Sequence, residues 1–138
     1  MKTKEDIIHQ FENFNLENHN IEIFRELTDD LFKNKNPESA LAAMFGILER
    51  YPDEELGSPG PLVHAIEKCA GYEHMLFESL KRQPGTLTLW MLHRLIKYDP
   101  RKEYVDVLRS VIDHPKASEQ TKEDAGVILS WVTCTSDE

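Results

Sequence analysis

The side chains in this chain best suited to chemistry are six histidines and two cysteines, and their spacing limits what they can do. His64, Cys69 and His74 follow one another at intervals of five residues. Helical zinc ligands come at shorter intervals, as in H-E-x-x-H, and turn ligands come as paired C-x-x-C. Neither pattern occurs, so we expect no metal site and no cofactor.

Ser58 lies in the segment Leu56-Gly57-Ser58-Pro59-Gly60, which has some likeness to a nucleophile motif. A hydrolase elbow reads G-x-S-x-G on a strand-to-helix turn. Here leucine stands at the first position, a proline follows the serine, and no predicted strand leads in. The glycines also lack the following Lys-Ser/Thr of a phosphate loop. We therefore expect a rigid turn here, and a protein that is not an enzyme.

Adjacent carboxylates are frequent, at 29–30, 53–55 and 137–138. Acid catalysis by a carboxyl group requires burial that raises its pKa, whereas these pairs have polar neighbours and should be solvated. They are either an ordinary charged surface or a face that recognises Lys and Arg of a partner. The second interpretation makes partner-binding candidates of Asp29, Asp30, Asp53, Glu54 and Glu55.

Trp90, His93, Arg94 and Lys97 have the i, i+3, i+4, i+7 spacing of one helix face. Tryptophan and arginine are favoured anchors of protein interfaces, which makes Trp90 a further partner-binding candidate. Trp90 also adjoins a strong apolar stripe, so the edge of the core is the alternative. Trp131 has the same two interpretations.

The charge of the chain is unevenly distributed. Its 138 residues carry a net charge of −9. Residues 1–60 hold six Lys or Arg against thirteen Asp or Glu, a net of −7, and the remainder hold ten against twelve, a net of −2. This acidity argues against nucleic acid and anionic membranes as partners and permits a basic protein partner, although acidity for solubility alone explains it equally well.

The length predicts one domain over residues 1–138. Two cysteines do not make a disulfide framework, the N-terminus has no apolar segment after its lysines, and no apolar run approaches ~18 residues. These features predict a cytoplasmic protein that does not cross a membrane.

Helical periodicity recurs throughout the chain, with apolar stripes at 7–14, 24–31, 41–51, 62–70, 75–80, 87–96, 104–112 and 125–132. Thr3, Thr86 and Ser118 are expected N-caps, and Asn36-Pro37 an expected N-cap and first residue. No window alternates as a strand does. The sequence thus predicts an all-α fold of about eight helices, packed as antiparallel hairpins and loosely similar to HEAT and armadillo stacks.

Two segments, residues 56–64 (LGSPGPLVH) and 89–96 (LWMLHRLI), carry a resemblance. In this order on a small acidic helical chain, they resemble immunity proteins that accompany bacterial polymorphic toxins, including those of contact-dependent growth inhibition. The resemblance covers roughly residues 37–115.

This resemblance implies a cytoplasmic inhibitor, monomeric when free, that binds the toxin domain of its own system one-to-one and occludes its active surface. Related toxins are commonly nucleases with basic surfaces, which an acidic inhibitor suits. The alternative is a helical-repeat adaptor that holds another cellular protein, because fold does not dictate function.

Overall fold

The computed structural model describes residues 3–17, 21–54 and 60–136, the last four of them by their backbone only. Within these residues the chain is all-α, as predicted, with eight α-helices, one short 3-10 helix and no strand. The elements are α1 Lys4–Glu12, α2 Ile23–Leu31, η1 Pro37–Ala40, α3 Leu41–Arg50, α4 Gly60–Lys68, α5 Tyr72–Arg82, α6 Thr86–Tyr98, α7 Lys102–Ile112 and α8 Glu119–Ser136.

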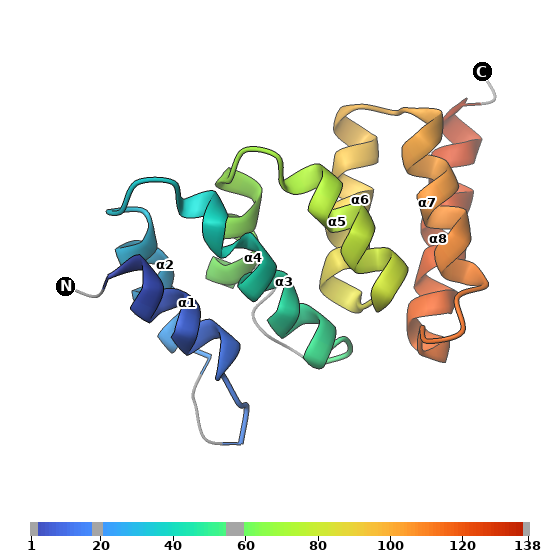
Figure 1. Cartoon of the computed structure of the whole chain (residues 1–138). Coiled ribbons are helices and arrows are strands. Elements are labelled where there is room, and N and C mark those ends of the chain that lie inside the picture. The colour runs from blue at the N-terminus through green and yellow to red at the C-terminus, as the bar shows by residue number, and fades with distance from the viewer. Residues whose placement is uncertain (1–2, 18–20, 55–59, 137–138) are drawn as a thin grey trace.

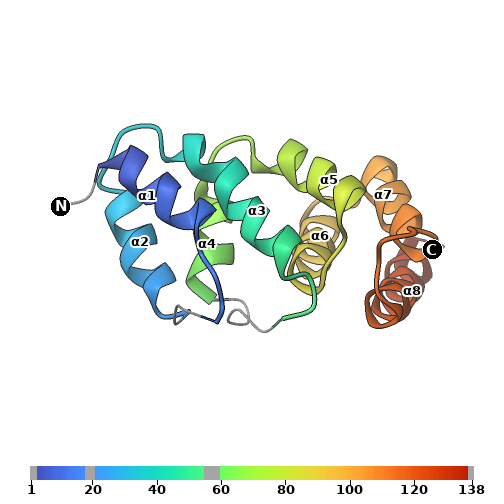
Figure 2. The same ribbon diagram turned by 60° about the horizontal axis from the view of Figure 1, so that its bottom comes forward.

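The helices alternate between two layers, as Figures 1 and 2 show. One layer, here named the odd layer, contains α1, α3, α5 and α7, each packed on the next. The other, the even layer, contains α2, α4, α6 and α8, in which α2 packs on α4 and α6 on α8. Consecutive helices pair across the layers as four antiparallel hairpins, which confirms the predicted stack.

The predicted N-caps are confirmed for α1 and α8 but not for α6. Thr3 Oγ1 accepts a hydrogen bond from the Asp6 amide at 3.2 Å, and the Asp6 carboxylate accepts one from the Thr3 amide at 3.3 Å, a complete capping box. Ser118 caps α8 by accepting the Thr121 amide at 3.1 Å. Thr86 is the first residue of α6 rather than its cap.

Asn36 is the N-cap residue of η1, as predicted, although it does not cap through its side chain. The side chain makes no capping hydrogen bond, and the backbone is left-handed with φ of 57°. Asparagine tolerates this conformation better than most residues, so Asn36 also turns the chain into the helix. Pro37 then opens the 3-10 helix that precedes α3.

The core is one cluster of buried apolar side chains that spans all four hairpins. Helix α3 lies within the stack, contacts α1, α4 and α5, and buries six residues. The largest fully buried side chains include Phe11, Phe24 and Phe45. The predicted apolar stripes therefore face inward, where their burial provides the main stabilisation.

Ser79 is the one described buried side chain whose polar atom lacks a hydrogen-bond partner, in the middle of α5. A buried hydroxyl without a partner is destabilising, and alanine has the higher helix propensity. We expect Ser79→Ala to raise the free energy of unfolding by about 1 kcal/mol. A urea titration measures this change. A Ser79→Ala protein less stable than the wild type would mean that the hydroxyl has a partner in solution.

In the described part of the chain, the helix ends that each hairpin joins lie along one edge of the stack, the lower edge in Figure 1. Hydrogen bonds join this edge, here named the linked edge. Arg50 Nη2 at the end of α3 donates to the carbonyl oxygens of Phe11 (3.0 Å) and Phe14 (3.3 Å), and the Leu16 amide donates to the Tyr51 hydroxyl at 3.3 Å. The first hairpin is thereby tied to the second.

The second, third and fourth hairpins are joined in the same way. The Pro52 carbonyl after α3 accepts the Thr86 amide at 2.8 Å. His114 Nδ1 accepts the Lys116 amide at 3.0 Å, so the ring proton is on Nε2, which donates to the Lys81 carbonyl at 2.6 Å. The linked edge therefore fixes the spacing of successive hairpins.

Candidate interaction surfaces

The histidines and cysteine considered for metal binding do not converge. His64 and His74 are both exposed on the surface. Cys69 is buried, its Sγ donates to the Ala65 carbonyl at 3.4 Å, and burial, with Glu38 adding to it, raises the pKa of its thiol. In the described parts of the chain, no three His, Cys, Asp or Glu side chains are grouped so that they could hold a metal ion.

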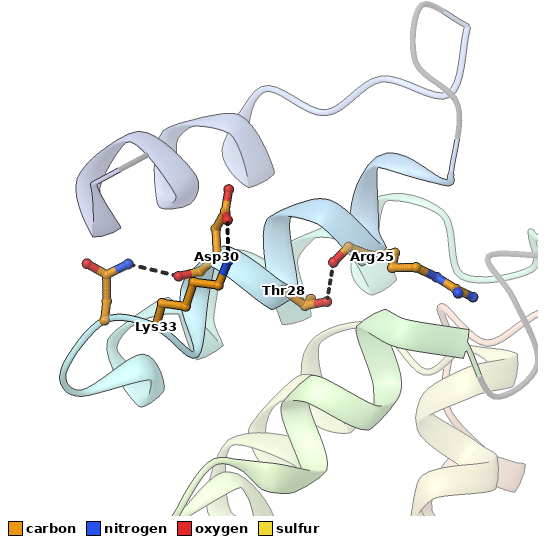
Figure 3. Close-up of polar contacts among 5 residues, drawn as sticks. Arg25, Thr28, Asp30 and Lys33 are labelled. Carbon is orange, nitrogen blue, oxygen red and sulfur yellow. Dashed lines mark hydrogen bonds and ion pairs between the residues drawn. The ribbon is translucent and has the colours of Figure 1, made fainter. Parts of the chain in front are cut away.

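The predicted acids of α2 differ in their surroundings. Asp29 is exposed. Asp30 has 18% of its side chain exposed, and its carboxylate lies 3.8 Å from Lys33 Nζ (Figure 3). Thr28 turns its hydroxyl to the main chain, donating to the Arg25 carbonyl at 3.2 Å. Of the two predicted acids, Asp29 is therefore the one placed to meet a partner.

Asp53 is exposed, as its sequence context predicted, and it also links two parts of the fold. Its Oδ1 accepts hydrogen bonds from Ser118 Oγ at 2.9 Å and from the buried Thr121 Oγ1 at 3.2 Å. The carboxylate thus ties the turn after α3 to the first turn of α8, where a negative charge is favourable. Glu54 is exposed. Glu55 lies outside the described residues.

Trp90 lies half-buried on α6 and forms, with His93 and Trp131, a group of three neighbouring rings that is here named the aromatic cluster. Its ring centroid is 5.4 Å from that of His93 and 6.4 Å from that of Trp131 on α8, and His93 and Trp131 are 5.5 Å apart. Burial, aided by Lys97 and Arg94, lowers the pKa of His93. The cluster joins two helices of the even layer at their surface.

Two cations of the even layer make contacts within the chain. Arg94 Nη2 lies 2.8 Å from the Glu67 carboxylate, which ties α6 to α4. Lys68 Nζ stands over the Phe32 ring, 5.8 Å from its centroid. Of the predicted face of α6, Arg94 is therefore paired although exposed, and Lys97 is exposed as well.

A shallow groove of about 760 Å³ lies on the linked edge and carries several basic side chains. Arg82 makes two hydrogen bonds to the Glu49 carboxylate, at 3.0 and 2.8 Å. Gln83 Nε2 donates to the Lys116 carbonyl at 2.9 Å. Arg82, Gln83, Arg50 and His114 thus all make hydrogen bonds within the chain. We therefore interpret these groove side chains as links that stabilise the linked edge.

No described helix is both long and apolar enough to cross a membrane. Comparison of the chain with protein-family models, with curated proteins and with solved structures finds no match.

Proposed function

We propose that this protein neutralises the toxin domain of a bacterial polymorphic toxin system, of the contact-dependent growth-inhibition kind, by binding it one-to-one in the cytoplasm. The toxin domain is basic, as a nuclease domain would be, and the bound protein occludes its active surface. The resemblance at residues 56–64 and 89–96 first suggested this function. Of these segments, 60–64 opens α4 and 89–96 lies within α6.

The observation that carries the proposal is the concentration of acid in the first 60 residues, which hold −7 of the net −9. The exposed acids Glu26 and Asp29 lie on α2 of the even layer, and the exposed Glu22 directly precedes this helix. Acidic groups on one face raise the association rate with a basic domain and favour one orientation of the encounter. A rigid stack presents them with little loss of conformational entropy.

Inhibition of the toxin tests the proposal directly. The toxin domain encoded beside this protein's gene is assayed with increasing amounts of the protein. We expect its activity to fall linearly to zero at one molar equivalent, because a tight one-to-one complex removes the active surface from substrate. Full toxin activity in the presence of excess folded protein would contradict the proposal.

Charge reversal on α2 should slow association. We expect the double variant Glu26→Lys with Asp29→Lys to lower the association rate about tenfold at low salt, because steering by these acids is lost. Stopped-flow mixing with the toxin domain at 20 and 300 mM salt measures the effect, which should shrink at the higher salt.

The control for this variant is Glu103→Lys with Asp106→Lys on α7. It changes the net charge equally, with the same spacing of three residues, on exposed positions of the odd layer. Equal slowing by both variants would show a general effect of net charge rather than recognition by the even layer.

The alternative function is that of a helical adaptor. The two-layer stack supports an adaptor as strongly as it supports a toxin inhibitor, since stacks of helical hairpins commonly bind proteins along one layer. An adaptor would bind several cellular proteins with modest affinity and would leave the toxin active. The inhibition assay therefore separates the two functions.

A further inference from the structure

Helix α8 has an exposed face that carries both acidic and large apolar side chains. It packs against α7 and α6 only on its inner sides. Four exposed residues follow one another along it at intervals of four, here named the α8 stripe: Glu119, Glu123, Val127 and Trp131. Val127 is 44% and Trp131 50% exposed, although both are large apolar side chains. The stripe therefore passes from two carboxylates to two apolar groups.

The exposed tryptophan of this stripe is held in place. Trp131 packs beside His93 and Trp90 in the aromatic cluster, with ring centroids 5.5 and 6.4 Å away. A side chain that is already fixed loses little conformational entropy on binding, which is a property of effective interface anchors. Burial and the neighbouring Lys97 and Arg94 lower the pKa of His93, which favours the uncharged form of this ring in the cluster.

We infer that the aromatic cluster and the α8 stripe anchor a basic protein domain against the even layer. This inference rests on the proposed function and names the surface that performs it. Charge complementarity identifies the occupant. Glu119 and Glu123 precede the apolar positions on α8, and further acids lie at the other end of the layer on α2. A matching partner has an apolar pocket for Trp131, with Lys and Arg about 12 Å from that pocket, where Glu123 lies.

The even layer is about as wide as a standard interface. Packed helices are spaced by about 10 Å, and α4 and α6 pack less closely than α2 with α4 or α6 with α8, so α2 and α8 are separated by at least about 30 Å. Figure 2 shows the four helices of this layer in one row. A standard interface of about 800 Å² per partner has a diameter of about 30 Å. A partner centred on the anchor of α8 therefore needs a larger than standard interface to touch the acids of α2, which otherwise act on it through their charge.

Some cations of this layer are engaged within the chain. Arg94 is paired with Glu67, and Lys68 is placed over Phe32. Arg25 on α2 and Lys97 at the rim of the aromatic cluster are exposed, and each reduces the attraction to a basic domain. We expect Lys97→Glu to strengthen binding of a basic domain two- to fivefold at low salt, through faster association.

The decisive variant is Trp131→Ala, measured by calorimetry against the toxin domain encoded beside this protein's gene. Truncation of an anchor residue of this type lowers the affinity at least about tenfold, mainly through faster dissociation. We expect a loss of this size for Trp131→Ala. The control is Tyr98→Ala, which removes a 90% exposed aromatic residue at the end of α6, outside the cluster. We expect the control to bind within twofold of the wild type.

A second pair of variants covers the case in which Trp131→Ala disturbs folding. Val127→Lys leaves the aromatic cluster intact and places a cation on the stripe, and Tyr98→Lys is its control. We expect only Val127→Lys to weaken binding by tenfold or more. If the wild type binds and both stripe variants bind equally well, the anchor is wrong and the proposed function stands. If the folded wild type does not bind, both are wrong.

Discussion

The Gly85→Ala protein is expected to lose about 3 kcal/mol of unfolding free energy, because the added methyl group has no space. A Cβ at this position would lie 2.7 Å from the Pro52 carbonyl oxygen and 2.9 Å from Pro52 Cα. These are backbone atoms and cannot move aside as a flexible side chain does. The turns after α3 and α5 would separate, and the hydrogen bond from Thr86 to Pro52 would lengthen or break.

Gly126→Ala is the matched control for this substitution. Gly126 lies within α8, and a Cβ there would meet no atom within 4 Å. Alanine in a helix interior should stabilise the protein by about 0.5–1 kcal/mol relative to glycine. Urea titrations of both variants with equal m-values give the comparison. A Gly85→Ala protein as stable as the wild type would mean that the two turns are not in contact in solution.

The Asp53→Ala protein is expected to lose about 2 kcal/mol, since the carboxylate accepts two hydrogen bonds that join the second hairpin to the fourth. Its removal leaves the buried Thr121 hydroxyl with poorer hydrogen bonding and weakens the start of α8. Asp53→Asn retains an acceptor and should lose about half as much. Thermal and urea unfolding measure both losses.

Glu54→Ala is the control for Asp53→Ala, because Glu54 is adjacent, equally charged and exposed. We expect a change within about 0.5 kcal/mol, as for other surface positions. Similar losses at both positions would indicate that net charge, rather than the hydrogen bonds of Asp53, sets the stability. If Asp53 stabilises the fold, a charge-reversal variant of Asp53 could bind more weakly only because it is less stable. Such a variant is then unsuitable for identifying the binding surface.

The sequence predicted the helices because each has an apolar stripe of its own, and α1 and α8 also have a local start signal. Thr3 with Asp6, and Ser118 with Thr121, are separated by only three residues, so their hydrogen bonds follow from local order. The left-handed turn at Asn36 has a weaker signal, since asparagine fits both a cap and that conformation.

The surfaces could be predicted only in part, because they combine residues that are distant in the chain. Asp53 meets Ser118 across 65 positions, so its residue type suggested a solvated acid rather than a link. The spacing of Trp90 and His93 placed them on one face, but nothing in the sequence placed Trp131 beside them. Such pairs arise from the stacking of hairpins, which periodicity within a helix does not encode.

The central claim, that this acidic helical stack binds and neutralises a basic toxin domain, is tested most directly by calorimetric titration. The protein is titrated into the toxin domain encoded beside its gene, at low and at high salt. We predict a one-to-one complex of nanomolar or tighter affinity that weakens as salt rises. No heat of binding at either salt concentration, with both proteins folded and binding also absent at a second temperature, would contradict the claim.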